Sequence, residues 1–207
     1  MNGIRRREIL LFIFTMKKII ITLAAMAVAV SSFAQASIGA GYLNQSKSNS
    51  DAKALNGFYV GADYNINLTG GLGVAPGVYY NFATWSDGGK NANASINEHY
   101  ISIPVMFNYS VNVAPGFDLF AFAGPTGRFG LASESKGSVA GFSASGDNYK
   151  NDNYQRAALL IGGGVGADIA DKVRFTVGYD YGLTNRYKNS NVSFNDKLVH
   201  VGVAFLF

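Results

Sequence analysis

The chain has 207 residues, a net charge of +4 and no cysteine, which excludes a disulfide framework, a thiolate metal site and a cysteine nucleophile. Residues 1–34 hold five of the 17 basic residues and one of the 13 acidic residues, so the rest of the chain has twelve of each and no net charge. The net positive charge of the full chain is therefore no evidence for a nucleic-acid partner.

Residues 16–36 are typical of a secretory signal peptide. Lys17 and Lys18 precede a short apolar run, and the small residues after it predict cleavage after Ala34 or Ala36. The apolar run is too short to span a bilayer, since a membrane helix needs about 20 residues. The sequence therefore predicts an exported protein.

Residues 1–15 are interpreted as an upstream extension from an alternative start, and residues 37–207 as a single domain. The alternative is an uncleaved membrane anchor over residues 9–30. Such an anchor would carry two lysines through the middle of the bilayer, at about 2.5 to 3.5 kcal/mol each on insertion scales. We favour the cleaved signal peptide.

The domain alternates apolar and polar residues with a period of two, and no amphipathic helix is indicated. Eight runs of 9 to 14 residues are predicted as strands: 36–44, 57–67, 71–84, 99–109, 117–129, 157–169, 173–184 and 197–207. They are longer than common globular strands. Their length suits tilted strands that cross a membrane.

The connections between these runs alternate between long and short. The long ones are rich in Asn, Ser, Gly, Asp and Lys and cover 45–56, 85–98, 130–156 and 185–196. The short ones are 68–70, 110–116 and 170–172. Long outer loops and tight periplasmic turns are typical of an up-and-down membrane barrel, so we expect an all-β, eight-stranded antiparallel transmembrane β-barrel with both chain ends on the periplasmic side.

Each run has one bulky apolar face and one small or polar face. In the last run the bulky face is Val201, Val203, Phe205 and Phe207. A soluble barrel would cover its outside with many Lys and Glu residues, which the second face lacks. We therefore expect the bulky face to contact lipid and the small face to line the lumen.

Two features conflict with regular strands. Proline cannot donate to a β-ladder, so bulges are expected at Pro76, Pro104 and Pro125. In run 117–129, Phe120 and Phe122 share a face with Asp118 and Arg128, and a slip at Gly124–Pro125 would reconcile them.

Four stretches carry a resemblance to a known family: YISIPVMFNY (100–109), FAFAGPTGRFG (120–130), IGGGVGADI (161–169) and RFTVGYDYGLTN (174–185). With the aromatic C-terminus, they resemble the PorT-type outer-membrane β-barrel domain of Gram-negative bacteria, and the architecture is similar to OmpX-type and OmpA-type barrels. The resemblance implies insertion by the outer-membrane assembly machinery, which would read Val203, Phe205 and Phe207 as its signal. It covers nearly the whole domain and implies no single activity, although some members serve protein secretion.

Five charged residues are predicted to face the lumen: Asp63, Arg128, Asp168, Arg174 and Asp180. Eight strands leave room only for side chains inside a barrel, so a salt-bridged plug is the favoured interpretation. A proton or ion path is the alternative.

No enzymatic, metal or cofactor site is expected. The two histidines are His99, beside Glu98 in an outer loop, and His200, on the lumen face of the last strand. The glycine run 162–166 is not followed by a helix, so it fails as a phosphate-binding loop. Gly162, Gly164 and Gly166 are expected instead to face the lumen and make room for large residues opposite, such as Tyr59 or Tyr79.

The longest connection, residues 131–156, either extends its hairpin above the membrane as a protruding sheet open to β-augmentation or stays an unstructured polar loop. The predicted function is a structural or surface-interaction role of an integral outer-membrane protein. Its expected partners are outer-membrane lipid, the assembly machinery and an unidentified surface ligand. A narrow pore and an accessory role in protein secretion are the alternatives.

Overall fold

The computed structural model describes residues 34–48, 53–89, 92–139, 142–150, 154–187 and 194–207. The predicted upstream extension and nearly all of the predicted signal peptide lie outside these residues. The first strand begins at Ala34 and pairs with its neighbour from that residue on. Cleavage after Ala34 would therefore leave this pairing nearly whole, whereas cleavage after Ala36 would remove two further pairs.

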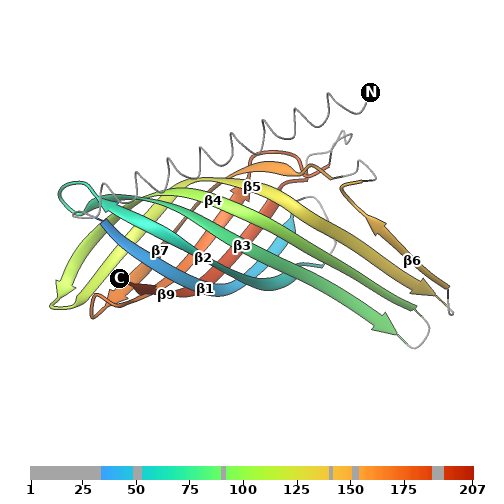
Figure 1. Ribbon diagram of the computed structural model, residues 1–207, viewed down its shortest axis with the longest axis horizontal. Helices are drawn as coiled ribbons and strands as arrows, with labels where there is room; N and C mark the ends of the chain where they lie inside the picture. The colour runs from blue at the N-terminus through green and yellow to red at the C-terminus, as the bar shows by residue number, and fades with distance from the viewer. Residues whose placement is uncertain (1–33, 49–52, 90–91, 140–141, 151–153, 188–193) are drawn as a thin grey trace, which may run out of the picture.

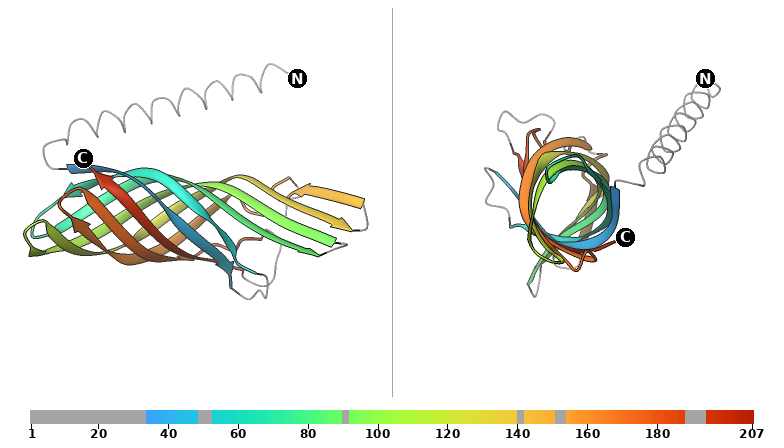
Figure 2. Two further views of the ribbon diagram at one scale, coloured as in Figure 1. Left: turned by 90° about the horizontal axis from the view of Figure 1, so that it is seen from below. Right: turned by 90° about the vertical axis from the view of Figure 1, so that its left-hand side faces the viewer.

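Eight strands form a closed antiparallel ring, seen end-on in Figure 2. The nine strands of the described chain are β1 (Ala34–Lys47), β2 (Leu55–Asn67), β3 (Leu72–Gly89), β4 (Ala92–Ala114), β5 (Phe117–Val139), β6 (Phe142–Asp147), β7 (Ala157–Ile169), β8 (Val173–Gly182) and β9 (Asp196–Leu206). Each strand of the ring pairs with its sequence neighbour in the ring, and β9 closes on β1. Strand β6 pairs only with β5 and lies outside the ring. The predicted eight-stranded up-and-down barrel is confirmed.

Tight turns join the strands at one end of the barrel. The backbone takes a positive φ at Gly70, Gly71, Gly116, Ala170 and Asp171. Glycine adopts this left-handed conformation without steric cost, which explains why three of the five positions hold it. These are the three short connections expected from the sequence, and the one between β4 and β5 is reduced to residues 115–116.

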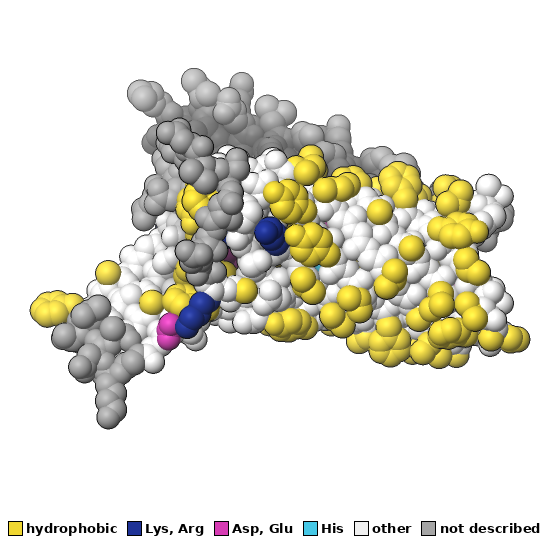
Figure 3. Space-filling model, turned by 180° about the vertical axis from the view of Figure 1, so that it is seen from behind, with side chains coloured by type: hydrophobic (Ala, Val, Ile, Leu, Met, Phe, Trp, Pro, Cys, Tyr) yellow, Lys and Arg dark blue, Asp and Glu magenta, His cyan; other side chains and the backbone are white. Residues whose placement is uncertain are grey.

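The outside of the barrel is apolar. Phe107, Val165 and Val177 are more than half exposed, as are many other large hydrophobic side chains on the ring strands. In Figure 3 these side chains gather around the barrel, on the right of the view. Few lie on the part of the molecule that extends beyond the barrel on the left. On β9, Val203 and Phe205 point outward while Leu206 is buried inside. No helix among the described residues is long and apolar enough to cross a membrane.

The prolines do not cause the expected bulges. Pro76 and Pro104 lie in ladders whose register is the same on both sides of them, and Pro125 pairs with Ile161 in a continuous β5–β7 ladder. The β4–β5 register shifts instead between His99 and Tyr100, where Leu131 on β5 is the extra residue, and between Asn112 and Ala114 at the turn. The expectation of proline bulges was wrong, because the ladders lose single bonds without changing register.

The expected register slip at Gly124–Pro125 of β5 is also absent. Pairing with β7 runs without interruption from Phe117 to Phe129. Phe120 is 8% exposed and faces the lumen together with Phe122 and Arg128. This strand therefore places aromatic rings inside the barrel, opposite to the rule that its bulky face contacts lipid.

Strands β3, β4 and β5 continue beyond the ring and, with β6, form a protruding sheet of residues 85–89, 92–97, 132–139 and 142–147 (Figure 1). Most of the segment 85–98 and the first part of 130–156, both expected as loops, are in this sheet. Of the two alternatives left open for residues 131–156, the protruding sheet is the one observed.

Candidate functional site

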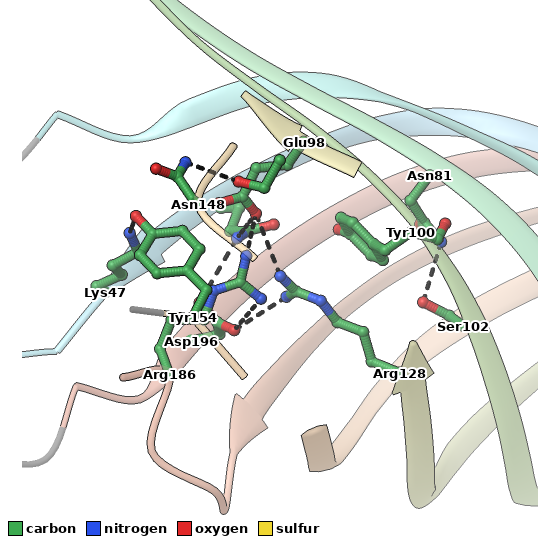
Figure 4. Close-up of polar contacts among 12 residues, drawn as sticks. Lys47, Asn81, Glu98, Tyr100, Ser102, Arg128, Asn148, Tyr154, Arg186 and Asp196 are labelled. Atoms are coloured by element: carbon green, nitrogen blue, oxygen red, sulfur yellow. Dashed lines mark hydrogen bonds and ion pairs between the residues drawn. The ribbon is translucent and has the colours of Figure 1, made fainter. Parts of the chain in front are cut away.

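Four buried charges meet inside the outer end of the barrel, which we call the ion-pair box: Glu98, Arg128, Arg186 and Asp196 (Figure 4). Glu98 Oε2 lies 2.7 Å from Arg186 Nη2 and 3.3 Å from Arg128 Nη2. Asp196 Oδ2 lies 3.0 Å from Arg128 Nη1. All four side chains are at most 4% exposed. Two positive and two negative charges therefore balance in a space buried from solvent.

The strands and one outer connection supply these charges. Glu98 continues the inward phase of Tyr100 on β4, Arg128 lies on β5, and Asp196 begins β9. Arg186 comes from the connection between β8 and β9. Burial by itself would lower the pKa of the Arg186 guanidinium, but the carboxylates of Glu98 and Asp196 raise it, so this arginine stays charged.

Aromatic and polar neighbours support the box. The Arg128 guanidinium lies 4.0 Å from the centroid of the Tyr100 ring, within cation–π range. Gln45 Nε2 donates to Glu98 Oε2 over 3.1 Å. These contacts fix the orientation of the charges, which a buried ion pair needs in order to offset the loss of hydration.

A tyrosine lid lies over the box, formed by Tyr149, Tyr154 and Tyr187. Tyr154 pairs with Tyr187 in an isolated β-bridge, and their ring centroids are 5.0 Å apart. Lys47 Nζ donates to the Tyr154 hydroxyl over 2.9 Å and lies 4.7 Å from its ring centroid. Burial raises the pKa of the Tyr154 hydroxyl, which therefore stays protonated.

An apolar layer lies next to the box and completes the closure of the outer end: Leu43, Leu55, Ala83, Tyr100, Leu160 and Leu198. Its members are at most 7% exposed. An aqueous path from the outside would have to cross the lid, the box and this layer. The described lumen is thus filled at its outer end by packed side chains.

A cavity of about 160 Å³ lies below the apolar layer, with Leu43 and Leu198 in its wall. Three separate polar contacts surround it. Arg174 binds Asp168 through two bonds of 2.7 Å, His200 Nε2 lies 3.5 Å from Asp180 Oδ2, and the Tyr79 hydroxyl donates to Asp63.

The five predicted lumen charges all lie inside the barrel, but they do not form a single network. Only Asp168 and Arg174 contact each other. Arg128 belongs to the ion-pair box, while Asp63 and Asp180 have Tyr79 and His200 as partners.

The sequence reasoning missed three of the four residues of the ion-pair box, namely Glu98, Arg186 and Asp196. All three fall in segments expected as loops. A signal for Glu98 was present, because its position continues the alternation of Tyr100 and Ser102 toward the outside. Nothing comparable marks Arg186, whose place depends on how a long connection folds back over the barrel.

The histidines do not form a catalytic pair with the loop carboxylate. His99 faces outward and shares a 2.6 Å hydrogen bond with the Tyr80 hydroxyl, whereas Glu98 points into the lumen. Among the described residues, no three His, Asp or Glu side chains are placed to hold a metal ion.

The lumen glycines of β7 make room for large side chains, but not for Tyr59 or Tyr79. A Cβ at Gly162 would meet the Asp180 carboxylate, and one at Gly164 would meet the Phe122 ring. The Tyr59 ring instead lies against Gly41 and Gly202. The glycines of β7 thus make room for large residues, as expected, but these are Phe120 and Phe122 of β5 and Asp180 of β8 rather than Tyr59 or Tyr79.

A family model described as outer membrane protein beta-barrel domain matches residues 25–188. The chain belongs to this family. The apolar outer surface of the ring is accordingly the lipid-facing surface of an integral outer-membrane barrel, with its short turns on the periplasmic side. The narrower PorT-type resemblance is not part of this finding.

Solved structures share the fold. The crystal structure of Ail, the attachment invasion locus protein of Yersinia pestis, is 15% identical with a TM-score of 0.50, over 84% of this chain and 98% of Ail. The complex of the same protein with the heparin analogue sucrose octasulfate is 16% identical with a TM-score of 0.51, over 84% of this chain and 99% of Ail. At this identity the likeness shows the fold alone. No curated protein matches the sequence.

Proposed function

We propose that this outer-membrane barrel is a non-enzymatic surface-interaction protein, which binds extended peptide segments along the free edge of its protruding sheet. The observation that carries the proposal is the pairing of β6. Within the described residues it bonds to β5 on one side and to no strand on the other. An open edge offers unpaired N–H and C=O groups to an added strand.

The composition of β6 supports this role. Edge strands are usually protected by Lys, Pro or bulges, and β6, with the sequence FSASGD, has none of these in its interior. Its side chains are small except for Phe142, which is 86% exposed at the tip. The opposite edge carries charged side chains, which disfavour strand addition, because Asp87 on β3 forms a 2.8 Å ion pair with Lys53. We therefore place the binding edge at β6.

A proline scan tests this edge. Along an antiparallel strand, the N–H groups of successive residues point to opposite sides. Of the two variants Ser143→Pro and Ala144→Pro, one therefore removes a donor from the free edge and the other removes a donor from the β5 ladder. With a photo-crosslinking amino acid at position 145 on living cells, we expect protein adducts that the edge-facing proline abolishes. The same crosslinker at Gly116, in a periplasmic turn, is the control. Adducts that persist in both proline variants would contradict strand addition.

A narrow pore is the competing function, and the closed outer end opposes it. We expect the purified protein to show no conductance above background in planar lipid bilayers at neutral pH. The physical reason is that the tyrosine lid, the ion-pair box and the apolar layer leave no wetted path. Stable single-channel steps of the unmodified protein would overturn this expectation.

An accessory role in protein secretion is the alternative to which the PorT-type resemblance points. A strain that lacks the protein would then show an altered set of surface and secreted proteins. An unchanged set would count against this role and would leave binding at the β6 edge unaffected.

A further inference from the structure

The lumen cavity has aromatic walls. The rings of Tyr59 and Tyr79 lie 5.7 Å apart, and the His200 imidazole lies 6.2 Å from Tyr59 and 6.4 Å from Phe122. Phe120 extends this wall, 6.0 Å from Phe122. The volume of about 160 Å³ is close to that of an engineered cavity of about 150 Å³ that binds benzene. A molecule of about six or seven heavy atoms fits this space.

The charge around the cavity is negative. Asp63 and Asp180 both line it and form no ion pair with an Arg or Lys among the described residues. The one cationic side chain in the wall, Arg174, already binds Asp168 through both of its hydrogen bonds. The three carboxylates and the one guanidinium have a net charge of −2 when His200 is neutral. The net charge is −1 when His200 is protonated. The cavity therefore favours a cationic occupant.

Buried polar atoms without partners line the same space. Thr126 is 6% exposed and Asp180 is 9% exposed, yet Thr126 Oγ1 and Asp180 Oδ1 have no hydrogen-bond partner within the described part of the chain. Asp63 Oδ1 is also without one. A buried polar group without a partner costs about 1 to 3 kcal/mol, so a molecule that offers hydrogen bonds to these three atoms would gain affinity from them.

We propose that the cavity binds a small organic ammonium ion. Aromatic faces attract such cations through their quadrupoles, as in the aromatic cages that hold quaternary ammonium groups. The two carboxylates supply the opposite charge, and the Thr126 hydroxyl supplies a hydrogen bond to a polar end of the ligand. A metal ion fits less well, because no three metal-ligating side chains converge in the described structure.

The closed outer end determines the route of entry. The lining of the cavity reaches Asn108 and Arg174, on the side of the short turns. We therefore place the entry of the proposed ligand on the periplasmic side, which makes the site independent of whatever binds the protruding sheet.

Choline is a suitable probe, because it has seven heavy atoms and a quaternary ammonium group. Its neutral carbon isostere, 3,3-dimethylbutan-1-ol, has the same shape without the charge. Binding of both is measured by calorimetry on the folded barrel in a maltoside detergent, since amine-oxide and phosphocholine detergents have zwitterionic headgroups whose positively charged nitrogen could compete with choline. We expect choline to bind at least about tenfold more tightly than the isostere, which corresponds to a desolvated cation–π contact with a charge contact.

Variants locate the site. Asp63→Asn and Asp180→Asn each keep the shape and remove a charge, and we expect each to weaken choline binding about tenfold without changing binding of the isostere. Asp87→Asn, on the protruding sheet, is the matched control and leaves both affinities unchanged. Heat-modifiable gel mobility verifies that every variant is folded. Equal affinity for the two probes, binding of neither, or loss of choline binding in the Asp87 variant would overturn the proposal.

Discussion

Replacing Glu98 with alanine is expected to destabilise the barrel by about 3–5 kcal/mol, the usual cost of removing one partner from a buried ion pair. Glu98 is fully buried and contacts both Arg186 and Arg128. Its loss leaves two buried guanidinium groups with one carboxylate, Asp196. The outer end, with the tyrosine lid over it, should loosen first.

Urea unfolding of the protein in lipid vesicles measures this effect, and two further variants separate charge from packing. Glu98→Gln combined with Arg186→Met removes a whole ion pair and leaves Arg128 with Asp196 at 3.0 Å. We expect this double variant to recover most of the lost stability. Asp87→Asn, in an exposed ion pair, should cause no measurable change. If the double variant were as unstable as Glu98→Ala, uncompensated charge would not be the cause.

Replacing Phe207 with alanine is expected to lower the level of the protein in the outer membrane severalfold while changing the stability of the folded barrel little. We propose that Val203, Phe205 and Phe207 are read as a signal by the assembly machinery. In the folded state the Phe207 side chain is 64% exposed, and the centroid of its ring lies 5.1 Å from that of the Phe205 ring. The substitution leaves the backbone unchanged, so the folded barrel loses only a surface contact.

The matched control is Phe175→Ala on β8. Phe175 is 49% exposed on the same lipid-facing surface, and its ring is lost in the same way. Outer-membrane fractionation and urea unfolding are compared for both variants. A normal level of the Phe207 variant, or an equal drop for Phe175→Ala, would show that general hydrophobicity and not a terminal signal governs insertion.

The alternation of residues was sufficient to predict the ring, because a strand between lipid and lumen must place one class of side chain on each face. It identified the outward face of β9 and the inward position of Arg128. It failed on β5, where Phe120 and Phe122 face inward. The reason lies on β7, whose glycines leave space for those rings, and that pairing across strands is not visible in either strand alone.

The candidate site was less predictable than the ring. The ion-pair box takes Arg186 from a connection and Asp196 from the first residue of β9, so it forms only when distant segments close over the barrel. The protruding sheet was one of two alternatives for residues 131–156. Its extent on β3 and β4 was missed because Ser, Asn and Gly residues, common in loops, make up much of both strands there.

The continuity of β4 and β5 has a mechanical consequence. Each strand runs through the bilayer and on into the protruding sheet, β4 over Ala92–Ala114 and β5 over Phe117–Val139. Hydrogen bonds of an antiparallel ladder lie across the strands, so a pull along them loads many bonds together in shear. A partner tethered at β6 would transmit tension into the whole barrel wall, and the anchorage would resist forces that peel a flexible loop open bond by bond.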